Sequence, residues 1–372
     1  MSQTQTDRRY MTLALRLAEK GRGFTSPNPM VGAVVVRNGR IIGQGSHRKA
    51  GGPHAEVIAL SQAGKRAKGG TLYVTLEPCS HLQKRTPPCV PLVLKSGIRR
   101  VVVAMVDPNP MVKGRGIAQL RRAGVAVDVG CGEAEASHLN EGYRHWVRTG
   151  RPFTILKAAM TLDGKIATST GESQWITGEA ARAHAHRLRA GIDAILVGIG
   201  TVLHDNPSLT ARPSALPVVR QPLRIVVDSR LRVPSKARVL EQQSSAHTLV
   251  ATTVAASRRK IERLKRRGID VLTLPARAGK VDLAKLWLRL GQVGVTSLLV
   301  EGGSELNAAV LRAGLAQRIM LYTAPMLLGG RNAKGVFGGT SPRQLRRARS
   351  LQNLRTEPLG RDILITADLI PQ

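Results

Sequence analysis

Apolar positions recur along this chain at two spacings, one typical of helices and one typical of strands. Within residues 8–20 the apolar side chains fall largely on one helical face, with Met11, Ala14 and Leu17 among them. Residues 31–36 and 40–45 have the pattern of two short strands, and the Asn38-Gly39 pair between them is a strong hairpin signal. The pattern therefore predicts an N-terminal helix followed by a β-hairpin.

Further along, short apolar strands alternate with amphipathic helices, an order typical of layered α/β domains. In the first half we predict helices over 54–63 and 116–123, strands over 71–75, 98–105 and 125–129, and a loop with Pro and Cys after the first of these strands. In the second half we predict strands over 153–157, 194–197, 223–227, 248–251, 271–274, 297–300, 318–322 and 362–366, and helices over 178–190, 258–267 and 305–312.

A polar helical stretch, 133–148, separates the two halves and ends at Thr149-Gly-Arg-Pro152. We place the domain boundary there, which gives domains 1–150 and 151–372. The two halves show no internal repeat, so we expect two different α/β domains.

The composition adds a large positive charge. The 372 residues include 57 Lys and Arg against 24 Asp and Glu, a net charge of +33, with +14 in residues 1–150 and +19 in 151–372. Such a charge first suggests nucleic acid. However, it is dispersed over both halves, and only 3% of the residues are aromatic, which is few for base stacking. We expect a dispersed basic surface and keep a nucleic-acid-binding protein as the alternative.

The sequence also disfavours secreted and membrane proteins. The first nine residues are polar and lack the apolar core of a signal peptide. No apolar run approaches the roughly 18 residues of a membrane span. Three cysteines are an odd number and too few for a disulfide framework. We therefore expect a cytoplasmic protein with no membrane partner.

A metal-binding pattern occurs in the first half. His54-Ala-Glu56 opens a predicted helix, and Pro78-Cys79 and Cys89 follow downstream. One imidazole and two thiolates supply three of the four tetrahedral ligands of zinc and leave the fourth position for water. Zinc deaminases combine this set with a glutamate that moves protons without binding the metal. Glu56 is therefore the candidate catalytic residue, with His54, Cys79 and Cys89 as ligands.

Each of these residues alone has a simpler interpretation, because a lone histidine is usually structural and a cysteine is often a buried thiol. The joint order of the three segments favours zinc-dependent hydrolysis of an exocyclic amine. Cys131 has no histidine companion, and we expect it to be a buried thiol. His47 and His81 either touch the substrate or lie near the site.

Four motifs carry a resemblance in this half: Thr25-Ser-Pro-Asn-Pro-Met-Val-Gly32, Gly52-Pro-His-Ala-Glu56, Leu76-Glu-Pro-Cys-Ser-His81 and Thr86-Pro-Pro-Cys89. They resemble the deaminase part of the RibD family of bifunctional riboflavin biosynthesis enzymes. The resemblance implies a cytidine-deaminase-like three-layer α/β/α domain, in which Asn28 helps to bind a pyrimidine and the loop 80–88 reaches the substrate phosphate.

The loop between the two cysteines departs from the family pattern by one extra residue. It has nine residues, and Leu82-Gln-Lys-Arg85 replaces a glycine-containing turn. The extra residue leaves the zinc assignment intact and affects the phosphate contact that the resemblance implies, Lys84 or Arg85. The cysteines of editing deaminases are typically about two residues apart. The longer loop here favours a small phosphorylated substrate.

The second half lacks the Gly-x-Gly-x-x-Gly of an ordinary dinucleotide-binding fold. Two other glycine turns follow predicted strands, Val197-Gly-Ile-Gly-Thr201 and Val300-Glu-Gly-Gly-Ser304. Backbone N–H groups at such turns can approach a phosphate. Taken alone, each is more often an ordinary tight turn.

Longer motifs change that balance: Lys157-Ala-Ala-Met-Thr-Leu-Asp-Gly-Lys165, Gly171-Glu-Ser-Gln-Trp-Ile-Thr177, Gly200-Thr-Val-Leu-His-Asp-Asn-Pro-Ser-Leu-Thr210 and Val300-Glu-Gly-Gly303. They resemble the reductase domain of the same family, which implies a dihydrofolate-reductase-like α/β fold. Carried over by position, the resemblance implies an NADPH site formed by Ala159, Trp175, Thr201, Asp205, Ser229 and Gly303. It implies a ribose-phosphate site formed by Ser173, Arg189, Leu209, Arg212 and Glu301, with Lys157 nearby.

The residue types suit these roles. Arg189 and Arg212 can each donate two parallel hydrogen bonds to a phosphate. Lys157, Asp205 and Glu301 are candidates for holding the sugar hydroxyls and handling the proton, and the sequence does not order them by role. Alternatively, Trp175 is a core residue, and Arg189 complements the dipole of its helix.

The resemblance thus implies a bifunctional enzyme with Zn²⁺ and NADPH as cofactors. Its first domain would deaminate 2,5-diamino-6-ribosylamino-4(3H)-pyrimidinone 5′-phosphate, and its second would reduce the ribosyl group, giving 5-amino-6-ribitylamino-uracil 5′-phosphate. A homo-oligomer with no nucleic-acid partner is also implied. The alternatives are a basic nucleic-acid-binding protein or editing deaminase, and a reductase whose deaminase half is impaired by the altered cysteine loop.

Overall fold

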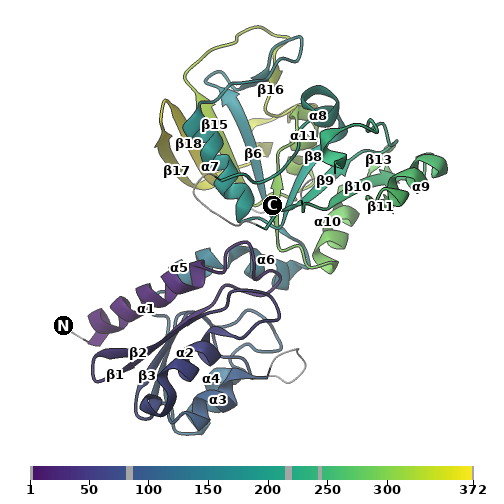
Figure 1. Cartoon of the computed structure of the whole chain (residues 1–372). Helices are drawn as coiled ribbons and strands as arrows, with labels where there is room; N and C mark the ends of the chain where they lie inside the picture. Colours follow the sequence, from purple (N-terminus) through teal and green to yellow (C-terminus); the bar gives the residue numbers. More distant parts are fainter. Residues whose placement is uncertain (1–2, 81–86, 214–219, 242–244, 371–372) are drawn as a thin grey trace. The chain divides into compact units, whose positions relative to one another are not determined.

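The computed structural model describes residues 3–80, 87–213, 220–241 and 245–370 (Figure 1). The chain forms two compact units, Met1–Gly150 and Arg151–Gln372. Each unit is built around its own sheet, so the α/β alternation predicted for both halves is confirmed. Among the described residues, no helix has the length and apolar character needed to cross a bilayer.

The first unit contains a five-stranded sheet of order β2-β1-β3-β4-β5. Its strands are β1 (Gly32–Arg37), β2 (Arg40–Ser46), β3 (Thr71–Val74), β4 (Arg100–Val103) and β5 (Ala126–Val129). Strand β1 is antiparallel to β2 and β3, and the last three strands are parallel. The predicted hairpin is present, and Asn38 and Gly39 both have positive φ, as a tight hairpin turn requires.

Helices cover both faces of this sheet. They are α1 (Gln3–Glu19), α2 (Ala55–Ala63), α3 (Cys89–Lys95), α4 (Arg115–Arg122), α5 (Glu133–Leu139) and α6 (Glu141–Thr149). A Cβ on Gly32 would lie 1.9 Å from the carbonyl oxygen of Ala14 in α1, whereas a Cβ on Gly45 would lie 2.1 Å from that of Ala55 in α2. Because Gly45 pairs with Ala33, the neighbour of Gly32, the two helices lie on opposite faces. The unit therefore has three layers.

Two features of this unit differ from the sequence prediction. The loop expected after β3 contains α3, a helix whose third residue is Pro91. Proline is tolerated in a first helical turn because the N–H groups there have no partner within the helix. The single helix expected over 133–148 is interrupted at Asn140, which separates α5 from α6.

The second unit contains a nine-stranded sheet of order β11-β10-β9-β8-β14-β6-β15-β18-β17. Its strands are β6 (Phe153–Thr161), β8 (Ala194–Gly198), β9 (Leu223–Val227), β10 (Thr248–Thr253), β11 (Asp270–Leu274), β14 (Ser297–Val300), β15 (Arg318–Ala324), β17 (Leu351–Leu359) and β18 (Asp362–Leu369). Neighbouring strands from β11 to β15 in this order are parallel, and β18 and β17 complete the sheet as antiparallel strands.

The helices of this unit are α7 (Glu179–Ala190), α8 (Ile199–Asp205), α9 (Arg258–Arg266), α10 (Leu283–Gln292) and α11 (Ser304–Arg312). Short two-stranded pieces, β7 (Lys165–Ala167) with β16 (Lys334–Gly335) and β12 (Ala276–Arg277) with β13 (Lys280–Val281), complete it. Helices α8 and α10 and strand β17 were not predicted. Strand β17 is exposed over almost its whole length, so its sequence lacks the alternation that marks a half-buried strand.

Candidate active sites

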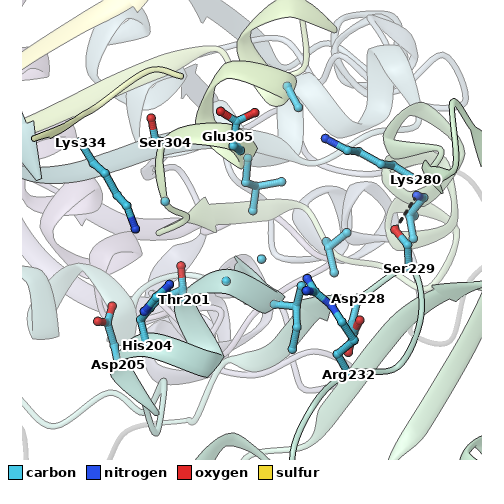
Figure 2. A pocket seen from close by; sticks show the side chains of 18 of the residues that line it. Thr201, His204, Asp205, Asp228, Ser229, Arg232, Lys280, Ser304, Glu305 and Lys334 are labelled. Carbon is cyan, nitrogen blue, oxygen red and sulfur yellow. Dashed lines mark hydrogen bonds between the residues drawn. The ribbon is translucent and has the colours of Figure 1, made fainter. Parts of the chain in front are cut away.

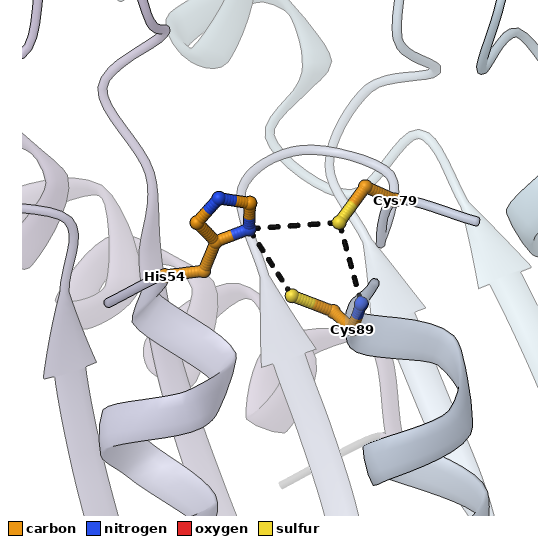
Figure 3. Close-up of side chains that lie close together, drawn as sticks. All are labelled: His54, Cys79 and Cys89. Atoms are coloured by element: carbon orange, nitrogen blue, oxygen red, sulfur yellow. Dashed lines mark hydrogen bonds between the residues drawn. The ribbon is translucent and has the colours of Figure 1, made fainter. Parts of the chain in front are cut away.

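The three predicted metal ligands of the first unit lie together (Figure 3). His54 directly precedes α2, Cys79 follows β3, and Cys89 is the first residue of α3. Nδ1 of His54 lies 3.2 Å from Sγ of Cys89 and 3.5 Å from Sγ of Cys79. In a tetrahedral zinc centre, a nitrogen and a sulfur ligand atom are about 3.5 Å apart. The donor set and its spacing therefore fit zinc.

The main chain of β2 sets the position of His54. A Cβ on Gly43 would lie 2.0 Å from the carbonyl oxygen of Ala59, and a Cβ on Gly45 would lie 2.1 Å from that of Ala55. Helix α2 therefore lies directly on the backbone of β2, at a separation that only glycine allows. This contact places the start of the helix, and with it His54, beside the two cysteines.

Glu56 lies in the first turn of α2 and is only 3% exposed. Burial raises the pKa of its carboxyl group, and the nearby Cys79 reinforces that shift. The carboxyl group also interacts with the side chain of Cys89. Glu56 is thus beside the cluster, as a proton-transferring group must be.

Asn28 is connected through His47 to the segment that carries the predicted zinc ligand His54. The side-chain amide of Asn28 lies 3.1 Å from Nε2 of His47, and Nδ1 of His47 lies 3.0 Å from the carbonyl oxygen of Pro53, the residue before His54. Because a carbonyl oxygen only accepts, Nδ1 carries the proton and Nε2 accepts from Asn28. Burial lowers the pKa of His47, which favours this neutral form.

Glu77 is a structural support that the sequence analysis missed. Its side chain is 2% exposed and accepts hydrogen bonds from one backbone N–H group in the loop after β4 and from three at the start of α4. The donors are Asp107, Gly114, Gly116 and Ile117, at 2.9–3.2 Å. A carboxylate is favoured at a helix N-terminus. The bonds hold the segment that continues through Pro78 to Cys79.

The second unit contains a cavity of about 860 Å³ at the ends of β8, β9 and β14 (Figure 2). Five predicted residues line it: Ser173, Thr201, Asp205, Ser229 and Gly303. The lining also includes His204, Asp228, Arg230, Arg232, Lys280 and Lys334, none of which was predicted. Figure 2 shows Arg232 and Lys280 near Asp228 and Ser229, whereas Lys334, His204 and Asp205 lie toward the other end of the view.

Three other predicted residues form a buried ion cluster. Glu301 accepts two hydrogen bonds from Arg189, at 2.8 Å from Nε and 2.7 Å from Nη2, and lies 3.9 Å from Nζ of Lys157. Burial alone would raise the pKa of Glu301, but Arg189 and Lys157 outweigh it and lower the pKa to about 2. Burial lowers the pKa of Lys157, against the effect of Glu301. The guanidinium group of Arg189, which was predicted to bind a phosphate, donates its two parallel hydrogen bonds to Glu301.

The remaining predicted reductase residues are spread around this region. Ala159 is partly buried on β6, and Leu209 is buried with a positive φ of 52°. Arg212 is exposed, and its backbone N–H donates to Nδ1 of His186 at 3.2 Å. Trp175 is 67% exposed beneath the guanidinium of Arg182, so its interpretation as a core residue is wrong.

Three expectations concern the residues around the cysteines. Cys131 is half-buried against the core and not fully buried as expected. His81, Lys84 and Arg85 belong to residues 81–86, which lie outside the described residues. The phosphate contact expected from that loop therefore stays a prediction.

Known proteins and family models match this chain over nearly its whole length. Residues 4–105 match the cytidine and deoxycytidylate deaminase zinc-binding region, and residues 152–365 match the RibD C-terminal domain. The chain is 46% identical over 362 residues to the riboflavin biosynthesis protein RibD of Actinobacillus pleuropneumoniae, covering 97% of this chain and 95% of that protein.

Solved structures give the same result. Acinetobacter baumannii RibD, form 1, superposes with a TM-score of 0.90 and 37% identity over 99% of this chain and 100% of that one. A diaminohydroxyphosphoribosylaminopyrimidine deaminase/5-amino-6-(5-phosphoribosylamino)uracil reductase from Thermotoga maritima superposes with a TM-score of 0.86 and 35% identity, again over 99% of this chain and 100% of that one.

Proposed function

Because the chain belongs to the RibD family of bifunctional riboflavin biosynthesis enzymes, we propose specific roles for its residues in the deaminase and reductase reactions. The cluster of His54, Cys79 and Cys89 beside the buried Glu56 carries the assignment for the first reaction. The fold class is that expected, a cytidine-deaminase-like domain followed by the reductase domain of this family.

In the deaminase, His54, Cys79 and Cys89 hold the metal, and Glu56 moves protons. Zinc, when bound, lowers the pKa of a water molecule to about 7, so that it attacks at neutral pH. The water oxygen bonds to the ring carbon, and the carbon–nitrogen bond to the exocyclic amine breaks. Glu56 takes one proton from the water and gives it to the ring nitrogen. It then takes the remaining hydroxyl proton and gives it to the amine, which leaves as ammonia as the carbonyl group forms. Asn28 orients the pyrimidine.

In the reductase, Lys157, Glu301 and Asp205 contact the sugar. A nicotinamide cofactor, when bound, would supply the hydride that reaches C1′. The C1′–O4′ bond of the ribose ring breaks, and O4′ takes a proton from one of these three side chains. The ion cluster places Lys157 and Glu301 together, whereas Asp205 lies in the cavity and accepts a hydrogen bond from the hydroxyl group of Ser173 at 3.1 Å. We assign Arg212, which is exposed, to the substrate phosphate, and we assign Arg189 to holding Glu301.

The cofactor we propose is NADPH, bound in the 860 Å³ cavity, whose lining includes Thr201, Ser229 and Gly303. Ala159 and Trp175, which are not among the lining residues, stay predicted contacts of this cofactor. The volume of this cavity falls within the range of roughly 300–1,000 Å³ that is typical of small-molecule sites. Gly303 and the start of α11 line it, where backbone N–H groups can face a diphosphate. Arg230, Arg232 and Lys280 add positive charge at one side. This charge supports the phosphorylated dinucleotide over NADH.

Removing that charge is expected to change cofactor preference. The double variant Arg232→Ala/Lys280→Ala should raise the KM for NADPH on the order of tenfold, because hydrogen bonds to a charged phosphate are lost. The KM for NADH should hardly change. Steady-state reduction with each cofactor measures both values. Lys285→Ala, an exposed lysine on α10 outside the cavity, is the control. Equal effects on both cofactors would contradict the assignment.

We further propose a cytoplasmic homo-oligomer without a nucleic-acid partner. The three cysteines form no disulfide among the described residues, and those proposed to bind zinc must stay reduced. Strand β17 is an edge strand with no further neighbour among the described residues, and Leu351 and Leu354 are 41% and 64% exposed. A monomeric mass by light scattering would contradict the oligomer. Tight RNA binding with a steep salt dependence would support the nucleic-acid alternative.

The function is tested by three measurements on the full-length protein. Zinc content, ammonia release from the diaminopyrimidine phosphate and oxidation of NADPH by the deaminated product should all be positive. NADPH oxidation without ammonia release would show that the altered cysteine loop impairs the deaminase half. Ammonia release that survives complete removal of zinc by a chelator would overturn the metal assignment.

A further inference from the structure

Asn140, the residue between α5 and α6, makes two hydrogen bonds to the segment that carries Asn28. Its side chain is 2% exposed. Oδ1 accepts from the backbone N–H of Met30 at 2.8 Å, and Nδ2 donates to the carbonyl oxygen of Met30 at 3.0 Å. Only an amide side chain of this length provides one acceptor and one donor for such a pair. Asn140 thus holds the main chain of Met30 from both sides.

The held residue is part of the proposed pyrimidine site. Met30 is two residues from Asn28, whose own backbone N–H donates to the carbonyl oxygen of Thr25 at 2.8 Å. The side chain of Asn28 bonds to His47, and His47 bonds to the residue before the zinc ligand His54. A shift of Met30 would therefore move Asn28 relative to the metal ligands.

The segment that carries Asn140 also contacts the other side of the proposed deaminase site. Tyr143, one helical turn after Asn140, is buried and donates its hydroxyl hydrogen to Asp107 at 3.0 Å. The backbone N–H of Asp107 in turn donates to Glu77, two residues before Cys79. Two neighbouring buried side chains of one segment thus connect to both the Asn28 segment and the Cys79 segment.

Asn140 and Tyr143 lie outside both regions that match family models, residues 4–105 and 152–365. We propose that Asn140 is a positioning residue of the deaminase, which sets the place of Asn28 through the backbone of Met30. The stretch between the two catalytic regions is then part of the first active site and not only a connection. This inference rests on the proposed role of Asn28 in binding the pyrimidine.

The test compares Asn140→Ala and Asn140→Asp with Asn28→Ala in the full-length enzyme. The aspartate keeps the volume but places a carboxylate oxygen against the carbonyl of Met30. Both Asn140 variants should raise the KM of deamination on the order of tenfold or more, since small displacements of a positioning group are costly. Zinc content and reduction of the deaminated substrate should stay unchanged. In the double variant Asn28→Ala/Asn140→Ala, the KM should be no higher than with Asn28→Ala alone.

His138→Ala is the matched control, an exposed residue on α5 two positions away, and it should leave the KM unchanged. If Asn28→Ala raises the KM and the Asn140 variants do not, the inference is wrong while the role of Asn28 stands. Independent, additive effects would also overturn it. Loss of zinc or of reduction in both Asn140 variants would show that Asn140 only maintains the fold. No effect of Asn28→Ala would remove the proposed role of Asn28 and the inference together.

Discussion

Glu56→Gln is expected to abolish ammonia release while leaving zinc content unchanged. The amide has the same size as the carboxyl group, but it cannot take a proton from water and return it to the substrate. General acid–base groups of this kind contribute about 10²–10⁴-fold to the rate, so the kcat of deamination should fall by that factor. Zinc analysis of the purified protein and a single-turnover ammonia assay measure the two quantities.

The control for this change is Glu133→Gln, an exposed glutamate at the start of α5 in the same unit. It should behave as the unmodified enzyme does. Reduction of the deaminated substrate should also be unaffected by Glu56→Gln, because the reductase residues belong to the other unit. Undiminished ammonia release would refute the proton-transfer role of Glu56.

Glu301→Gln is expected to have the corresponding effect on reduction. The carboxylate accepts two hydrogen bonds from Arg189 and lies beside Lys157, so its loss leaves two buried cations without their counter-charge. We expect the kcat/KM of reduction to fall on the order of a hundredfold or more, because the reacting sugar loses its positioned neighbours. Deamination should be retained. Separate assays with the diaminopyrimidine and with its deaminated product measure the two steps.

The pH dependence of stability provides a second measurement on this variant. The folded-state pKa of Glu301 is lowered to about 2, below the value of about 4.3 in an unfolded chain. The ion cluster therefore stabilises the fold fully above pH 4.3, and this stabilisation is lost as the pH falls toward 2. The difference in melting temperature between unmodified and Glu301→Gln protein should be largest near neutral pH and shrink on acidification.

Glu179→Gln, an exposed glutamate in the first turn of α7, is the control for both measurements. Arg189 lies on the same helix, so the control reports on changes of charge near that helix without touching the cluster. If reduction and deamination both survive Glu301→Gln, the reductase site is misplaced.

The sequence predicted the elements that depend on local chemistry. The Asn38-Gly39 turn requires positive φ at both residues, and this requirement can be seen in two letters of sequence. Helix α3 was missed because Pro91 in its first turn resembles a loop signal. Strand β17 was missed because almost all of its residues are exposed, and the burial that produces alternation is absent.

The same distinction applies to the sites. Zinc requires particular side chains, so the grouping of His54, Cys79 and Cys89 could be predicted from residue types and order, and the structure brings the three together. Glu77 and Asn140 could not, because their partners are backbone groups up to 110 residues away, and any residue type supplies those groups. The cations at the proposed cofactor site were also missed, since they come from the loop after β9 and from the short strands β13 and β16, which only the folded chain brings together.

The contact between α2 and the glycines of β2 limits which substitutions this domain can accept. Side chains elsewhere in the core can exchange for others of similar volume, and the helix still rests on the same two backbone positions. Such exchanges leave His54, the proposed metal ligand at the start of the helix, in place. Gly43 and Gly45 cannot be exchanged in this way, because a Cβ atom at either position would push α2 away from the sheet.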